Sequence, residues 1–214
     1  MMKKIVLPIA IISMFTISSC GGDKSSETNN ETEQTCFYSY EATAATQVKW
    51  TAFKTSDKVA VAGQFNQVNV TANGKSTKIT DVLETIKFNI PTSSTNTAKE
   101  ERDVKIVQSF FNVMEATDLI FGHVKSATGD NTSGTCTFYL TINKVEKEVL
   151  LNYMVTDTTI KLTGEIDILD FNGENAITSL NEACKDLHKG TDGVSKTWPN
   201  VELSIETTLK KDCH

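Results

Sequence analysis

The sequence lacks three features that mark common functional classes. It has no run of about twenty apolar residues, which a membrane-spanning helix needs. It has no basic excess, because its formal net charge is −6. An acidic chain of this kind argues against nucleic acid as a partner and against electrostatic adhesion to anionic lipid headgroups. A Cys-x-x-Cys pair is also absent, which disfavours redox chemistry by a thiol pair.

Catalytic motifs are missing as well. The chain has no Gly-x-Ser-x-Gly elbow, no phosphate-binding Gly-rich loop and no His-Glu-x-x-His sequence. Its three histidines, His123, His188 and His214, stand in no motif with a nucleophile. The neighbouring acids Glu100-Glu101 open a hydrophilic segment and indicate a solvated helix face. We therefore expect a protein that is not an enzyme and that carries no cofactor.

A metal site is the weaker alternative. Cys184-x-x-x-His188 would place two ligands on one helical face, and Cys213-His214 would complete a set of four. This spacing is loose, however, and an exported chain favours disulfides over a thiolate metal site. We expect no metal.

The N-terminus predicts export. Lys3 and Lys4 precede a short apolar core, Ile5–Ile17, which ends in Ser18-Ser19-Cys20. A core this short, followed by small residues, is typical of a signal peptide. The segment resembles a bacterial lipobox, which implies cleavage after residue 19 and a diacylglyceryl group on Cys20.

The residues after Cys20 predict a flexible tether over 20–35, because Gly21–Gln34 contains no bulky apolar residue. Loss of Lys3 and Lys4 with the signal peptide changes the formal net charge from −6 to −8. Membrane attachment would then come from the acyl chains, at about 0.8 kcal/mol per buried methylene. Gly21-Gly22 lacks the Asp of an inner-membrane retention signal, so we expect an outer-membrane lipoprotein facing the periplasm or the cell surface.

From residue 36 onward, apolar and polar residues mostly alternate. Ile160–Ile168, Val201–Leu209 and Cys136–Ile142 each place apolar side chains on one face. This period of two is typical of half-buried antiparallel strands. Turn signals separate the strands, among them Asn73-Gly74 and Asn143–Glu146, which both favour a tight hairpin. Eight strands are expected, at about 37–53, 58–72, 81–91, 117–127, 134–143, 147–156, 159–170 and 198–210. The first of them is expected to break near Ala44-Ala45.

Two segments break this rhythm. Thr97–Phe110 is rich in helix formers, and Asn175–Lys189 carries apolar residues at helical spacing. We expect two short helices near the ends of an all-β, antiparallel domain that spans 36–214.

The inward positions are almost all apolar, which fits either a packed core or an apolar cavity. Alternation places ten side chains there: Phe88, Ile90, Phe138, Leu140, Ile142, Leu162, Ile166, Ile168, Leu203 and Ile205. Phe110 and Phe111 follow the first helical segment, and one of the two rings is expected to face the lumen.

Four motifs follow each other along the chain: Val48–Phe53 with Val61–Phe65; the connection Ser93–Val113 with Arg102-Asp103 and Phe110-Phe111; Phe138–Val149; and Gly164–Phe171. In this order they resemble the motifs of the YceI-like family of periplasmic lipid-binding proteins. Lys144 replaces the usual glycine of the third motif. The resemblance implies an eight-stranded, lipocalin-like barrel that encloses a polyisoprenoid or a quinone-like lipid.

The resemblance also implies a function, namely non-catalytic binding, storage or transport of one long apolar molecule. The ten inward side chains, together with Phe110 and Phe111, are expected to contact this molecule. A structural module of the envelope with a solid barrel core is the alternative. The Arg102-Asp103 pair either meets a polar headgroup or fixes the helix on the barrel rim, and the second role is favoured. A homodimer is a further possibility.

Four cysteines besides Cys20 allow three disulfide pairings, and the sequence alone does not choose between them. In a barrel the first and last strands are neighbours. On that basis we expect Cys36–Cys213, which leaves Cys136–Cys184.

Overall fold

The computed structural model describes residues 34–214, which form one compact unit. The predicted signal peptide over 1–19, the lipidation site Cys20 and nearly all of the tether over 20–35 lie outside the described residues.

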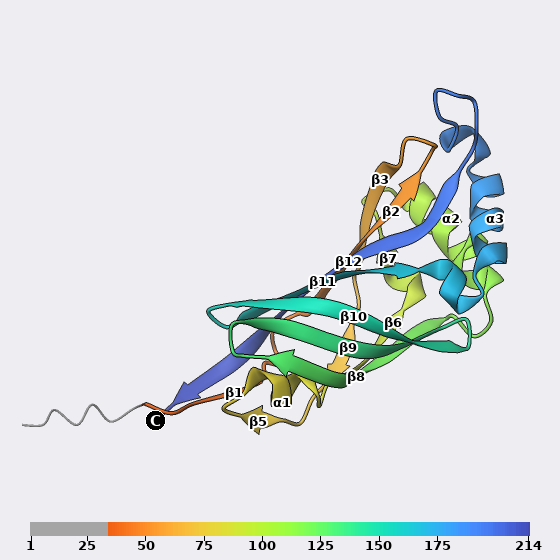
Figure 1. Cartoon of the computed structure of the whole chain (residues 1–214). Coiled ribbons are helices and arrows are strands. Elements are labelled where there is room, and N and C mark those ends of the chain that lie inside the picture. The colour runs from red at the N-terminus through yellow and green to blue at the C-terminus, as the bar shows by residue number, and fades with distance from the viewer. Residues whose placement is uncertain (1–33) are drawn as a thin grey trace, which may run out of the picture. The chain divides into compact units, whose positions relative to one another are not determined.

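One antiparallel sheet makes up most of the unit (Figure 1). Ten of its strands follow each other in the order β4-β6-β8-β9-β10-β11-β12-β2-β3-β7, while β1 joins β12 and β5 joins β1. The strands are β1 (Cys36–Tyr40), β2 (Gln47–Lys54), β3 (Val59–Phe65), β4 (Asn69–Thr71), β5 (Lys75–Ser76), β6 (Lys87–Pro91), β7 (Thr95–Asn96), β8 (Leu119–Gly129), β9 (Ser133–Ile142), β10 (Val145–Thr156), β11 (Thr159–Asp167) and β12 (Thr197–Cys213).

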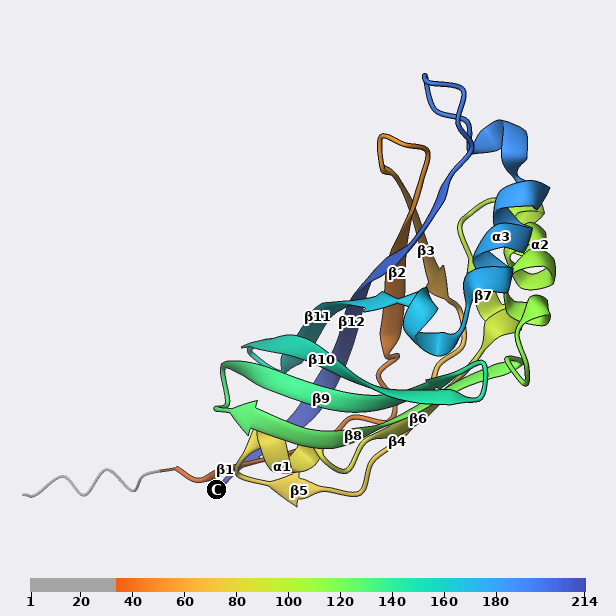
Figure 2. The ribbon, with the colours of Figure 1, turned by 45° about the vertical axis from the view of Figure 1, so that its right-hand side comes forward.

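The sheet curls into a half-barrel with an inner and an outer face (Figure 2). Its two end strands, β4 and β7, do not pair with each other. This arrangement confirms the predicted all-β, lipocalin-like fold, although the strands are more numerous than the expected eight. The segment expected as one strand over 58–72 is interrupted between Phe65 and Asn69, and the first strand breaks between Tyr40 and Gln47.

In the described part of the chain, three α-helices accompany the sheet. They are α1 (Ile79–Leu83), α2 (Glu100–Ser109) and α3 (Glu174–Ala183), and short 3-10 turns cover Thr92–Ser94, Phe111–Val113, Ile168–Phe171 and Lys185–Leu187. Both predicted helices are present as α2 and α3. Within residues 34–214, no helix has the length and apolar character needed to cross a membrane.

Helix α1 stands where a strand over 81–91 was expected. Ile79, Val82 and Leu83 lie at helical spacing and all three are completely buried. Their burial holds this single turn in place, although a helix of five residues is not stable alone. Tertiary packing therefore overrides the local strand pattern here.

Two turns had been expected to be tight. Asn143 and Lys144 both adopt positive φ, 53° and 58°, which is the conformation of a two-residue hairpin between β9 and β10. Asn143 supports the turn because its Nδ2 donates to the carbonyl oxygen of Phe171 at 2.9 Å. The prediction of a hairpin at Asn73-Gly74 is wrong. The strands on either side of this dipeptide do not pair with each other, because β4 pairs with β6 and β5 pairs with β1.

The disulfide between Cys36 and Cys213 is present, as predicted. These residues face each other in the antiparallel register of β1 and β12, which places the two ends of the described chain side by side. The register therefore explains the pairing.

The expected bridge between Cys136 and Cys184 is wrong, since both are free and buried. Cys136 lies on β9 opposite Leu151, near the β8–β9 turn, whereas Cys184 follows α3 at the other end of the sheet (Figure 2). Burial raises the pKa of the Cys136 thiol to about 12, so it stays protonated. Because Cys213 is bonded to Cys36, the four proposed metal ligands do not form one set.

Candidate functional site

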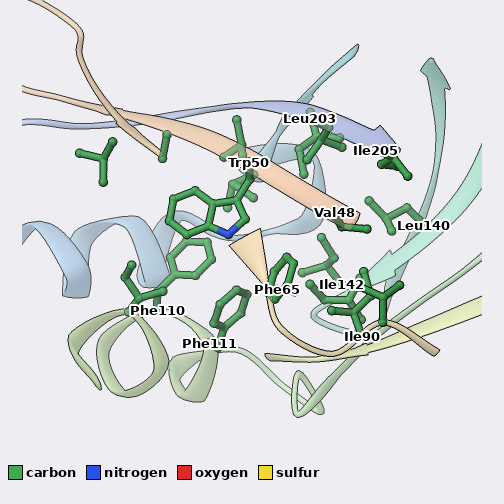
Figure 3. Close-up of a pocket in the computed structure, with 18 of the residues that line it drawn as sticks. Val48, Trp50, Phe65, Ile90, Phe110, Phe111, Leu140, Ile142, Leu203 and Ile205 are labelled. Carbon is green, nitrogen blue, oxygen red and sulfur yellow. The ribbon is translucent and has the colours of Figure 1, made fainter. Parts of the chain in front are cut away.

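A cavity of about 750 Å³ lies on the concave face of the sheet. Its wall comes from the inner faces of the long strands, from α2 and from α3. Figure 3 shows apolar side chains converging on this space from strands and helices that are distant in sequence. The volume is within the range of small-molecule sites in proteins, about 300–1,000 Å³.

The structure places all twelve predicted contact residues in the cavity wall. These are Phe88, Ile90, Phe110, Phe111, Phe138, Leu140, Ile142, Leu162, Ile166, Ile168, Leu203 and Ile205. Alternation along each strand brings them together, because every second side chain points to the concave face. Their contact with a ligand stays a prediction.

Aromatic rings form two groups in the wall. Phe88 packs edge-on against Phe138, with 6.1 Å between ring centroids. Phe111 lies 5.1 Å from Phe110 and 6.3 Å from Phe65. Both Phe110 and Phe111 line the cavity, so the expectation that only one of the two rings faces it is wrong (Figure 3).

Sequence reasoning missed several wall residues, above all Trp50. The alternation of Val48, Trp50 and Ala52 on β2 carried the signal, and all three line the cavity. The indole lies against Gly63 on β3, where a Cβ atom would collide with the ring. A glycine is needed at this close approach. The buried Nε1 of Trp50 has no hydrogen-bond partner within residues 34–214.

One end of the cavity is apolar and sealed. Leu83 of α1 and Ile86, which follows it, form part of the wall there, and both are buried. Ile79 holds the helix in place, because its backbone N–H donates to Oδ1 of Asn131 at 2.8 Å. No charged side chain contributes to the wall from α1 or from the residues of β6.

The other end is bordered by charged side chains. Lys54 reaches it from β2, and Arg102 and Lys105 reach it from α2. Asp103 points elsewhere: its Oδ1 accepts hydrogen bonds from the backbone N–H of Thr97 at 2.8 Å and from the Thr97 hydroxyl at 2.6 Å. Asp103 therefore fixes the start of α2, while its neighbour Arg102 is left at the cavity. The two residues do not act as a pair.

His188 stands at the same charged end. Asn181 Oδ1 accepts from the hydroxyl of Thr197 at 3.1 Å, so the Thr197 oxygen is free to accept from Nδ1 of His188 at 2.8 Å. This network leaves Nε2 of the neutral ring as an acceptor. Burial, and then the charges of Lys54, Arg102 and Lys105, lower the pKa of His188 to about 4.

Comparison with known proteins agrees with this geometry. The family model of the YceI-like domain matches residues 38–209. Among curated protein sequences, none matches the chain.

Solved structures of low sequence identity share the fold. A polyisoprenoid-binding domain from Saccharophagus degradans superposes with a TM-score of 0.58 at 15% identity, over 82% of this chain and 98% of that domain. BcnA from Burkholderia cenocepacia gives 0.55 at 13% identity, over 77% and 96% of the two chains. The YceI protein of Campylobacter jejuni gives 0.50 at 20% identity, over 72% and 85%. The match over residues 38–209 shows that the chain belongs to the YceI-like domain family.

Proposed function

We propose that this protein binds one long-chain apolar lipid, such as a polyisoprenoid or a quinone-like molecule, in the cavity of its half-barrel. The observation that carries the proposal is the cavity of about 750 Å³, whose wall is mostly apolar and holds its charged side chains at one end. The YceI-like fold supports lipid binding in general, and the Saccharophagus degradans domain of the same fold is described as polyisoprenoid-binding. Binding would store or carry the lipid without covalent chemistry.

The energetics favour a long chain. Each methylene that moves from water into an apolar wall contributes about 0.8 kcal/mol, so several isoprene units together would outweigh the entropy lost on binding. Side chains such as Leu140, Ile142 and Phe138 offer only carbon atoms to the ligand. The wall therefore selects for length and apolarity, and any polar group of the ligand belongs at the charged end.

The alternative was a structural module with a solid barrel core. That hypothesis predicted a lumen too small for a lipid tail, and a cavity of about 750 Å³ does not fit it. Binding of another envelope protein through the outer surface would be a separate property, on which the cavity has no bearing.

Filling the cavity tests the proposal. Ala52 lines the cavity on β2, and Ala62, on the neighbouring strand β3, is exposed and lies outside the wall. We expect Ala52→Trp to lower the affinity for a long-chain prenol at least about tenfold, since lost burial of two methylenes already exceeds 1.4 kcal/mol. Ala62→Trp is the matched control and should bind as the unaltered protein does.

Native mass spectrometry of protein purified from the envelope gives the second readout. The unaltered protein should retain a copurified lipid, which Ala52→Trp should lack. Lipid-free protein that also fails to bind added prenols, or equal binding by both tryptophan variants, would refute the proposal.

We further propose that the domain is held at the outer membrane by acyl chains on Cys20, through the tether over 20–35. The lipobox-like sequence and the polar composition of Gly21–Gln34, which has no bulky apolar residue, support this proposal. Cys20→Ala should release the protein from the membrane fraction, and retention of that variant would contradict it.

A further inference from the structure

We propose that the charged end of the cavity is a subsite for an anionic headgroup, a phosphate monoester, carried by the lipid whose chain fills the cavity. This inference rests on the proposed function for the chain, but adds a polar recognition step to it. The half-buried cations Lys54, Arg102 and Lys105 would hold the phosphate.

The three cations come from separate parts of the sequence to one place. Lys54 ends β2, while Arg102 and Lys105 lie on α2, and each borders the same cavity. None of them forms an ion pair within residues 34–214. Only Lys54 has a hydrogen-bond partner there, since its Nζ donates to the carbonyl oxygen of Leu187 at 2.8 Å. The chain is acidic as a whole, so an unpaired cationic cluster at a cavity end is a local exception.

The carboxylates of the same end do not neutralise the cluster. Glu100 and Glu101 border the cavity, as does Lys99, but all three side chains belong to exposed residues. Arg102 and Lys105 are half-buried on the same helix. Charges in water are screened strongly, whereas partly buried charges are screened much less. The field inside the cavity end is therefore positive.

His188 lies within reach of the same three cations. Burial is the main cause of its lowered pKa, and the charges of Lys54, Arg102 and Lys105 lower the pKa further, with no carboxylate opposing them. These cations thus lie close enough to act on one ring at the cavity wall. The ring is neutral at pH 7, so it does not add a charge, but its Nε2 can accept a proton that a monoester carries.

The donor set favours a phosphate over a smaller anion. Arg102 offers a planar fork of N–H donors, and two ammonium groups can meet the remaining oxygens. A phosphate monoester has three oxygens that accept such bonds. A prenyl phosphate satisfies both parts of the cavity, with its chain along the apolar wall and its phosphate at the cations.

The test compares two ligands that differ only in the headgroup. Binding of geranylgeranyl monophosphate and of geranylgeraniol is measured by tryptophan fluorescence or calorimetry on the purified full chain. We expect the phosphate to bind at least about tenfold more tightly at low salt, because hydrogen bonds to charged groups contribute about 1.5–3 kcal/mol. Raising the salt concentration should reduce this preference.

Variants then assign the preference to the cations. Arg102→Gln with Lys105→Gln should remove most of the preference, which is measured as the ratio of the affinities of this variant for the two ligands. Lys161→Gln, at an exposed position on β11 outside the cavity, is the control and should change neither affinity. The pKa of His188, followed by NMR, should rise when geranylgeranyl monophosphate binds and stay near its starting value with geranylgeraniol.

Three results would overturn the proposal. Equal affinity for the two ligands would show that the headgroup is not recognised, and an unchanged preference in the double variant would place recognition elsewhere. Inorganic phosphate that shifts the pKa of His188 as effectively as the prenyl phosphate would indicate a free-phosphate site instead. Failure of both ligands to bind would count against the proposed function itself.

Discussion

The two ends of the cavity are built in opposite ways. At the sealed end, α1 has only five residues, yet Ile79, Val82 and Leu83 are all fully buried. At the charged end, α2 has ten residues and none of them is fully buried. Figure 1 shows α1 beside β1 and β5, at the end that holds the disulfide, while α2 lies against α3 at the other end.

The comparison shows that burial, rather than helix length, decides which end of the cavity is fixed. Regions with few buried apolar contacts open at low free-energy cost, and regions in the core open only on global unfolding. Cys36–Cys213 and α1 make the sealed end a fixed base for the cavity. Helix α2, which has no fully buried residue, adds less buried apolar surface to the charged end. The end that we propose to recognise the headgroup is thus also the less strongly packed end.

The largest expected effect is loss of the disulfide at the sealed end. Cys36→Ser with Cys213→Ser should lower the free energy of unfolding by about 2–5 kcal/mol, because the bridge restricts the unfolded chain over a sequence separation of 177 residues. Urea unfolding measures the change. Amide exchange should accelerate in α1 more than in α2.

Cys184→Ser is the control, since this free thiol lies beside α3 and closes no loop. It should leave exchange in α1 unchanged. If the double variant unfolded at the same urea concentration as the unaltered protein, the sealed end would owe nothing to its covalent bond.

A smaller effect, the difference between two losses of stability, should follow from matched substitutions in the two helices. Ile79→Ala removes a fully buried side chain from α1 and should cost about 2–5 kcal/mol of unfolding free energy. Ile106→Ala removes the same atoms from α2, where the side chain is half-buried, and should cost about 1 kcal/mol. Thermal or urea unfolding of both variants tests the contrast, and equal losses would contradict the asymmetry.

The long strands were predictable because alternation is a local signal. Cys136–Ile142 and Ile160–Ile168 each carry their inward side chains at every second residue, and β9 and β11 follow them closely. Short elements were not predictable from such a signal. The elements β5 and α1 depend on contacts with β1 and β8, which are distant in sequence and which no local pattern reports.

At the site, too, residues that follow from a local pattern were predicted, and residues that meet only through the fold were missed. The twelve predicted wall residues follow from alternation and from the family resemblance, and all of them line the cavity. The charged end was only partly foreseen, because Lys54, Arg102 and His188 meet through the curl of the sheet. The pairing of Cys136 with Cys184 failed for a related reason: counting cysteines cannot show that two of them lie at opposite ends.

The smallest expected effect is a pH dependence at the charged end. His188 has a pKa of about 4 in the folded protein, below its ordinary value of 6.5. As the pH falls, the unfolded chain therefore takes up a proton at this ring at a higher pH than the folded protein does. Stability from this group is complete above pH 6.5 and is lost as the pH falls towards 4. Because the ring is partly exposed to solvent, we expect a loss of only about 1–2 kcal/mol.

The substitution His188→Asn isolates this contribution. An asparagine can still donate to Thr197, but it does not titrate. The unfolding free energy of the variant should therefore vary less between pH 7 and pH 5 than that of the unaltered protein. Carboxylates with a lowered pKa, such as Asp130 and Asp192, have ordinary values of 3.8 and lose their contribution mainly below that window. A parallel pH profile for the two proteins would mean that the folded protein does not lower the pKa of His188. A divergence below pH 6.5 would show that the folded protein lowers the pKa of His188, through burial first and then through the cations at this end of the cavity.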